Sequence, residues 1–357
     1  MAEIAGRLCR EAGLEVEFHE AEPGRPSVVA RHRFGDGPSV CFCSHIDVVP
    51  AGDRRLWQHP PFAAVVENGV MHGRGTADAK GPVAAGIEAA AALIESGAVT
   101  TGALELALVV DEETMGFKGA GHLVKEGVVS PDYAIVGEPT SLKVVRAQRG
   151  AHWMRITTRG RAAHGSAPER GVNAILHMAE IIVHLEETLP DIRHPLLGGA
   201  TLNVGTISGG EKTNIVPAWC QVEVDRRTVP GETPESVEDS IRAAIRLAQQ
   251  RYDDLDAHVE TPLSCLPFEV PEGSPVVTAG VAAVRTAGAS GEIVGFRGAS
   301  DARFLFEAGA DTIVFGPGDI GLAHTARERV SLAEVETAAH AYALALGRLL
   351  AMQMPVG

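Results

Sequence analysis

The chain has 357 residues, of which 45% are hydrophobic and 22% charged, and its net charge is -15. This composition is typical of a soluble globular protein, and at this length we expect two domains. The excess of acidic residues argues against nucleic acid or an anionic membrane surface as a partner, because both require clustered lysine and arginine. No stretch approaches the roughly 18 consecutive apolar residues of a membrane span.

The start of the chain and the cysteines indicate the compartment. Residues 1–12 carry charges throughout and predict an amphipathic helix, with Ile4 and Leu8 on its apolar side, that ends at Gly13; this is not the pattern of a signal peptide. Five cysteines, an odd number without framework spacing, favour free thiols in a reducing, cytoplasmic location. Cys41 and Cys43 alternate through an apolar strand, so we expect buried thiols rather than metal ligands.

Strands and helices alternate along the first part of the chain. We predict strands at residues 16–18, 40–43, 103–110 and 133–136, and the last two are almost continuously apolar, as in strands covered on both faces. An alanine-rich helix is predicted from Pro82 to Ile94, with proline in its first turn and Gly97 just after its end. The pattern predicts an α/β core with a mostly parallel sheet.

The pattern changes in the middle of the chain. From about Gly150 the order becomes strand, helix, strand, strand, helix and strand, which is the split β-α-β arrangement of a ferredoxin-like α+β domain. After Thr261 the earlier alternation returns, with strands at 292–296 and 311–318, a helix at 302–309 and a long helix from Ser331. We therefore predict a discontinuous larger domain of residues 1–149 and 262–357, with a smaller domain of residues 150–261 inserted into it.

Histidine and acidic side chains fall where the predicted strands end. Open α/β sheets collect their ligands at the carboxyl ends of parallel strands, so we expect these side chains to converge. Taken singly, each could be a capped loop residue or an acid at a helix N-terminus. The residues concerned are His45, Asp78, Asp111, Glu112, Glu113, Glu138 and His324.

This set of side chains suits a metal centre. Carboxylates packed together repel one another and are protonated more easily when buried, so the cluster needs a cation to stay ionised. Mixed imidazole and carboxylate ligands favour zinc, with cobalt or manganese as substitutes. Two histidines and three carboxylates are more than one ion requires, and a pair of ions about 3.5–4 Å apart that share a bridging carboxylate explains them better.

Five motifs carry a resemblance to a known family. HIDVVP, GRGTADAKG, DEE, GEPT and GPGDIGLAHT occur in the order found in the dinuclear zinc deacylases and exopeptidases, which include acetylornithine deacetylase, succinyl-diaminopimelate desuccinylase and a glutamate-releasing carboxypeptidase. The resemblance covers residues 14 to 345. Members usually carry a further helix before the position of Met1, so this chain is expected to be short at its start. Ser44 replaces their usual glycine.

The resemblance implies a role for each motif residue. Asp47 would orient a ligand histidine. Glu112 would act as the general base that takes a proton from the zinc-bridged water. The larger domain would be catalytic and the smaller one a lid or dimerisation domain. The two Zn²⁺ ions would be held by His45 and Glu138, by Glu113 and His324, and by Asp78 as the bridge.

The smaller domain resembles the family at three positions. RAAHGSAPERGVNAI is similar to the segment whose histidine, here His164, reaches across a dimer interface to stabilise the oxyanion, which implies a homodimer. The family usually has HSS-x-P where this chain has HGSAP. Asn214 and Arg227 match residues that hold the substrate carboxylate. Arg227 could also be a solvated strand arginine, and the alternation of a strand places Arg226 on the opposite face.

The remaining signals carry less information. GASDAR, residues 298–303, resembles a pocket-lining turn, and we assign no chemical role to Ser300 or Asp301. His59, His72 and His152 match no ligand position and are expected on the surface or in packing. The turn at Gly73 has G-x-G without the continuation of a dinucleotide-binding motif, which argues against a dehydrogenase.

The sequence thus predicts a metal-dependent amidohydrolase that removes an acyl group from an N-acyl amino acid with a free carboxylate. The loop GPGDIGLAH resembles the acetylornithine deacetylase branch. The alternative is an exopeptidase, a dipeptidase or carboxypeptidase, that uses the same dinuclear site on short peptides. A non-catalytic homologue that only binds metal or ligand is the third hypothesis, and the intact set of ligands and base argues against it.

Overall fold

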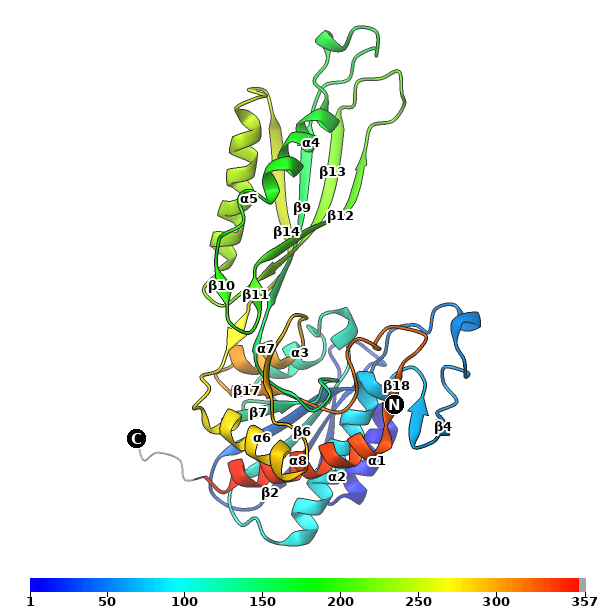
Figure 1. Cartoon of the computed structure of the whole chain (residues 1–357), viewed down its shortest axis with the longest axis vertical. Coiled ribbons are helices and arrows are strands. Elements are labelled where there is room, and N and C mark those ends of the chain that lie inside the picture. Colours follow the sequence, from blue (N-terminus) through cyan, green and yellow to red (C-terminus); the bar gives the residue numbers. More distant parts are fainter. Residues whose placement is uncertain (353–357) are drawn as a thin grey trace. The chain divides into compact units, whose positions relative to one another are not determined.

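The computed structural model describes residues 1–352 and divides the chain into two compact units (Figure 1). The larger unit consists of Met1–Arg146, Val270–Val294 and the residues from Ser300 onward, and the smaller unit of Ala147–Glu269 and Gly295–Ala299. The smaller unit extends beyond the predicted residues 150–261, because its last strand runs on to Cys265 and pairs there with Ala151.

Most strands of a nine-stranded sheet belong to the larger unit and form its centre. Four adjacent strands, β6, β3, β7 and β17, run parallel, and the pairs β1–β2, β2–β6, β17–β8 and β8–β15 are antiparallel. The predicted α/β class with parallel strands at its centre is therefore confirmed. In spatial order the strands are β1 (Glu15–His19), β2 (Ser27–Arg33), β6 (Ala103–Val109), β3 (Ser39–His45), β7 (Tyr133–Val136), β17 (Asp311–Val314), β8 (Val144–Gln148) and β15 (Phe268–Glu269), with β16 (Ile293–Phe296) also paired to β8.

Helices cover both faces of this sheet. Figure 1 shows α2 (Gly81–Ser96), α6 (Pro275–Thr286) and α8 (Leu332–Leu350) together on one side, and α3 (Ala120–Lys125) and α7 (Ala302–Glu307) on the other. The N-terminal helix α1 (Ala2–Glu11) packs on β1 and β2. Helix α2 approaches β3 so closely that a Cβ atom at Gly86 would lie 2.1 Å from the Phe42 ring, so only glycine fits there.

The larger unit also contains a separate three-stranded sheet, which we did not predict. Its strands are, in spatial order, β18 (Arg329–Ser331), β5 (Val70–His72) and β4 (Val65–Glu67). Strands β4 and β5 are joined through Asn68 and Gly69, both with positive φ, as a two-residue hairpin turn requires. Strand β5 leads directly into the turn of residues 76–80 that carries Asp78. The 3-10 turn Arg54–Leu56 precedes this sheet.

The smaller unit has the predicted β-α-β-β-α-β order. Its antiparallel sheet runs β12 (Thr201–Gly209), β13 (Trp219–Thr228), β9 (Gly150–Arg159) and β14 (Asp256–Cys265), and the short strands β10 (Arg193–His194) and β11 (Gly198–Gly199) form a separate ribbon. Helices α4 (Ala174–Leu185) and α5 (Pro234–Gln249) pack on one face, where alternate residues such as Met154, Ile156 and Val222 are buried. The other face exposes Trp153 and Trp219.

Two further sequence expectations can be compared with the structure. All five cysteines are free thiols, and Cys41 and Cys43 are buried, as predicted; the other three are buried as well. Within residues 1–352, no helix has both the length and the apolar character needed to cross a membrane.

Candidate metal centre and active site

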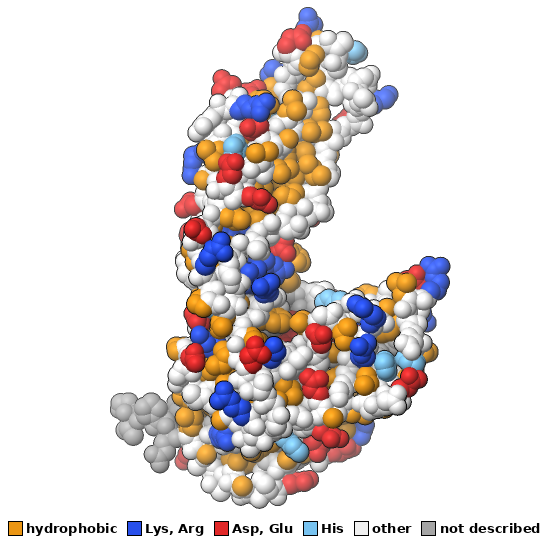
Figure 2. Space-filling view, in the orientation of Figure 1, with side chains coloured by type: hydrophobic (Ala, Val, Ile, Leu, Met, Phe, Trp, Pro, Cys, Tyr) orange, Lys and Arg blue, Asp and Glu red, His pale blue; other side chains and the backbone are white. Residues whose placement is uncertain are grey.

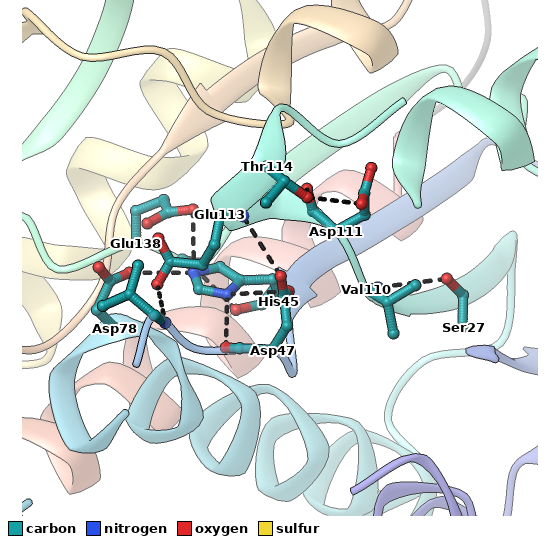
Figure 3. Close-up of polar contacts among 12 residues, drawn as sticks. Ser27, His45, Asp47, Asp78, Val110, Asp111, Glu113, Thr114 and Glu138 are labelled. Atoms are coloured by element: carbon teal, nitrogen blue, oxygen red, sulfur yellow. Dashed lines mark hydrogen bonds and ion pairs between the residues drawn. The ribbon is translucent and has the colours of Figure 1, made fainter. Parts of the chain in front are cut away.

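His45 is the last residue of β3, and its ring lies between two carboxylates (Figure 3). Its Nε2 atom is 3.0 Å from Asp78 Oδ1, while its Nδ1 atom is 3.5 Å from Asp47 Oδ1 and 3.2 Å from the backbone oxygen of Asp47. The side chain of His45 is only 1% exposed. Asp47 therefore fixes the ring from one side, and the other ring nitrogen faces the acidic cluster.

Asp78 occupies the middle of the cluster. Its second oxygen, Oδ2, is 3.2 Å from His324 Nε2, and that nitrogen is 2.8 Å from Glu113 Oε2. Glu138, just after β7, places Oε1 4.0 Å from His45 Nε2. The structure thus brings together all five residues for which the sequence predicted a ligand role, from five separated segments of the chain.

Of the acidic residues that follow β6, Glu113 lies in the cluster and Asp111 lies outside it. Residues Glu112–Thr114 form a 3-10 turn that begins after Asp111, whose φ is +74°. Val49 N–H donates to Glu113 Oε1 at 3.2 Å, and this bond holds the Glu113 carboxylate in the cluster. Asp111 instead accepts hydrogen bonds from Thr114 Oγ1 at 2.7 Å and the Lys118 N–H at 3.0 Å, so its side chain binds to the local chain and lies apart from the cluster (Figure 3).

The surrounding carboxylates raise the pKa values of both histidines of the centre. Hydrogen bonds with Asp78, followed by the charge of Glu113, raise the pKa of His324 to about 9. Burial alone would lower the pKa of His45, but its contacts with Asp47 and Asp78 raise it well above the usual value. Without a cation, the carboxylates would be neutralised by protons on these imidazoles.

Two carboxyl groups of the centre also have raised pKa values, so they hold their protons more tightly than usual. Burial, reinforced by nearby acids, raises the pKa of Glu138 well above its ordinary value. Burial likewise raises the pKa of Glu112 to about 8, with His45 opposing the shift and Asp301 and Asp78 adding to it. Carboxyl groups held in this way are able to take up a proton near neutral pH.

A buried ion pair, which we did not predict from the sequence, holds the backbone at Asp78 in place. Glu328 pairs with Arg74, and its Oε1 atom accepts hydrogen bonds from the backbone N–H groups of Ala77 and Asp78, both at 3.2 Å. The Glu328 side chain is fully buried. In the sequence, Glu328 stands between Arg327 and Arg329 like an ordinary surface acid, so no signal marked it.

Asp301 is a second buried acid near the centre whose role the sequence left open. It is 2% exposed, and within residues 1–352 its Oδ2 atom has no hydrogen-bond partner. Burial raises the pKa of Asp301 to about 7, and the charges of Arg303 and His45 oppose that shift. In the sequence, the resemblance of the GASDAR motif to a pocket-lining turn was the feature that marked this position.

The donor set fits divalent cations. Ligand atoms of His45, Asp78 and Glu113 all lie within 4.8 Å of one another. Glu138 Oε1 is buried and, within the described part of the chain, receives no hydrogen bond. A buried carboxylate oxygen without a donor is costly, and a cation would satisfy it. Five imidazole and carboxylate ligands that converge in this way match the chemistry of zinc-like ions.

The three predicted residues of the smaller unit are placed within that unit as follows. His164 is exposed, and its Nδ1 atom is 2.7 Å from Ser166 Oγ. Asn214 is also exposed and lies beside it, because the Gly165 N–H donates to the Asn214 carbonyl at 2.8 Å. Arg227 pairs with Asp225 at 2.8 Å on the open face of the sheet, whereas Arg226 is buried on the other face.

Comparisons with known proteins agree with this arrangement. Residues 41–348 match the model of Peptidase family M20/M25/M40. The chain is 31% identical to an acetylornithine deacetylase of Aliivibrio fischeri over 94% of this chain and 88% of that protein. It is also 31% identical to a succinyl-diaminopimelate desuccinylase of Methylobacillus flagellatus over 90% of each protein.

The fold is likewise that of a solved peptidase. The crystal structure of aminopeptidase PepT from Bacillus cereus superposes with a TM-score of 0.80, at 24% identity, over 97% of this chain and 92% of that one. The family match covers most of the chain and includes every segment that contributes to the candidate metal centre. The chain therefore belongs to Peptidase family M20/M25/M40 and is a metallohydrolase of that family.

Proposed function

We propose that this enzyme hydrolyses the amide bond of N-acyl amino acids, removing the acyl group from the α-nitrogen of an amino acid that has a free carboxylate. The observation that carries the proposal is the position of Asp78, with one oxygen toward His45 and the other toward His324, together with Glu112 beside them. The names of the two relatives, a deacetylase and a desuccinylase, support this substrate class.

The residues of the centre would hold two Zn²⁺ ions, with Co²⁺ or Mn²⁺ as substitutes. His45 and Glu138 would hold one ion, Glu113 and His324 the other, and Asp78 would be shared. When bound, the ions supply Lewis-acid chemistry: they polarise the amide carbonyl and lower the pKa of water. Asp47 keeps the His45 ring in place through Nδ1, so the opposite nitrogen stays directed at the centre.

Glu112 would act as the general base and then as the general acid. Its carboxylate takes a proton from the attacking water and delivers it to the departing amine. A pKa near 8 suits this double role, because neither protonation state is strongly disfavoured at neutral pH. Glu113, one residue later, is held in the cluster by the Val49 N–H and has the separate role of a ligand.

The smaller unit would act as a lid and dimerisation domain. Arg227 and Asn214 would bind the free carboxylate of the substrate, and His164 would stabilise the oxyanion from the partner subunit. A homodimer through this unit is supported by exposed apolar side chains on its open sheet face and edge. They include Trp153, Ile207 and Trp219. Figure 2 also shows apolar side chains gathered on the visible face of this unit.

An exopeptidase acting on dipeptides or C-terminal residues is the second candidate, because the fold is also that of an aminopeptidase. A panel of N-acetyl amino acids, N-succinyl amino acids and dipeptides, each assayed with added Zn²⁺ or Co²⁺, separates the two. Turnover of the acyl compounds with little dipeptide cleavage supports the deacylase, and the reverse supports the peptidase. Absence of turnover with every substrate and metal would identify a non-catalytic homologue.

A further inference from the structure

A second cluster of ligand-type side chains lies outside the candidate active site. His59, Glu67 and His72 each offer a donor atom, and the three atoms lie within 4.8 Å of one another. The cluster shares no residue with the active-site group. We propose that His59, Glu67 and His72 form an additional binding site for a zinc-class divalent cation.

Local structure explains why these side chains meet. Glu67 is the last residue of β4 and His72 the last residue of β5, and the register pairs His72 with Val65. Residues two apart on a strand share a face, so Glu67 lies on the same face as Val65 and His72. His59 comes from the preceding loop, and its ring centroid is 4.8 Å from that of His72. Histidine and acidic side chains adjoin on the lobe that carries β4 (Figure 2).

The distances suit one small ion. Zinc binds histidine nitrogen and carboxylate oxygen at about 2.0–2.2 Å, so two ligands of a tetrahedral site lie about 3.3–3.5 Å apart. His59 Nε2 and Glu67 Oε2 are 3.5 Å apart. The carboxylate is half-exposed and can adjust, and small side-chain rotations would draw the third donor inward. Two imidazoles and one carboxylate leave a fourth position for water.

A buried ring nitrogen of His59 that makes no hydrogen bond with the described residues also supports a bound cation at this site. His59 Nε2 is buried and, within residues 1–352, makes no hydrogen bond. The His59 side chain is 15% exposed, so bulk water satisfies it poorly. Its ion-pair partner, Glu67 Oε2, lies 3.5 Å away and makes no hydrogen bond to it, so the buried nitrogen is poorly satisfied at a cost in free energy, and a bound cation would remove that cost.

A cation here would tie the loop of His59 to the β4–β5 hairpin. Strand β5 is followed within a few residues by Asp78, so the ion would brace the segment that presents the shared carboxylate. A ligand that binds only the folded state stabilises it by mass action. Zinc in excess of the active-site requirement should therefore raise the unfolding temperature further.

The test is zinc binding to the whole purified protein after removal of metal by a chelator. Metal per chain is measured at buffered free zinc concentrations, and zinc-soaked crystals are analysed by anomalous diffraction. We expect one more zinc per chain in the wild type than in His59→Ala/His72→Ala, and an anomalous peak between the two rings. Glu67→Gln should weaken this extra site by at least about tenfold, because one of three ligands loses its charge.

The exposed His258, in the smaller unit, gives the control His258→Ala, which should bind zinc as the wild type does. Circular dichroism of each metal-free variant establishes that it is folded, and Glu67→Gln changes a half-exposed side chain that the fold does not require. Equal zinc content in the wild type and in either site variant, or the lack of an anomalous peak at saturating zinc, would overturn the proposal.

Discussion

Asp78 faces a different imidazole with each of its carboxylate oxygens: Oδ1 lies 3.0 Å from His45 Nε2 and Oδ2 lies 3.2 Å from His324 Nε2. The two histidines come from opposite ends of the chain. One side chain therefore determines how the two halves of the centre are spaced.

Replacing this carboxylate gives the first prediction. Asp78→Asn keeps the shape of the side chain but removes its charge, so we expect loss of at least one bound metal and a fall in kcat/KM of about 100-fold or more. Metal analysis and kinetics with an N-acetyl amino acid measure both effects. Asp36→Asn, at a fully exposed acid, is the control. Wild-type metal content in Asp78→Asn would contradict the assignment of a shared ligand.

Substitutions at Glu112 and Glu113 should have different effects on metal content. Glu112→Gln should reduce kcat by about 10²–10⁴-fold, because proton transfer is lost, and should leave metal content unchanged. Glu113→Gln should lower metal content as well as activity. Metal analysis beside steady-state kinetics distinguishes the two variants, and loss of metal in Glu112→Gln would show that it is a ligand instead.

Arg227 tests carboxylate recognition. Arg227→Ala should reduce kcat/KM by about 10-fold to 100-fold for substrates with a free carboxylate, because a hydrogen bond to a charged group contributes about 1.5–3 kcal/mol. The matched control is Arg155→Ala, an arginine on the same sheet face that pairs with Glu223 and Glu260. If the loss is as large for a substrate whose carboxylate is replaced by a carboxamide, Arg227 does not bind that group.

The metal-free protein should lose stability as the pH rises. The pKa of His324 is about 9 in the folded protein against an ordinary 6.5, so its protonated form stabilises the fold fully below about pH 6.5, and this contribution disappears as the pH rises through 9. Urea unfolding of the chelator-treated enzyme between pH 6 and 10 measures it. His324→Gln should show a smaller decline over that range, and an unchanged decline would exclude His324 as its source.

The buried pair of Arg74 and Glu328 should matter for stability. Glu328→Gln leaves the Arg74 charge buried without its partner, and breaking such a pair costs about 3–5 kcal/mol. Urea unfolding of the metal-free protein provides the free energy of unfolding. The exposed pair of Arg242 and Glu238 provides the control Glu238→Gln, for which a change below about 1 kcal/mol is expected.

Much of the candidate centre could be predicted because several of its side chains lie at or just after the ends of strands. His45 and Glu138 come directly at or after buried apolar strands, and such strands are recognisable from composition alone. Parallel pairing then brings their carboxyl ends to one edge. The metal-ligand roles and the roles of Glu112, His164, Asn214 and Arg227 remain predictions that the experiments above address.

Other features could not be predicted because they depend on distant pairing. Strands β4, β5 and β18 have three residues each, too few for a periodic pattern, and β18 joins the hairpin from more than 250 residues away. For the same reason His59 and His72 were expected only on the surface or in packing. Their proximity depends on the hairpin register, which the sequence pattern does not specify.

Glu328 holds the backbone of Asp78 across a sequence separation of 250 residues, and His324 approaches the same carboxylate from the same late segment. During synthesis on the ribosome, a nascent chain that has emerged only as far as α2 possesses His45 and Asp78 but neither of these late contacts. The order of translation therefore delays formation of the complete metal centre until almost the entire polypeptide has been made.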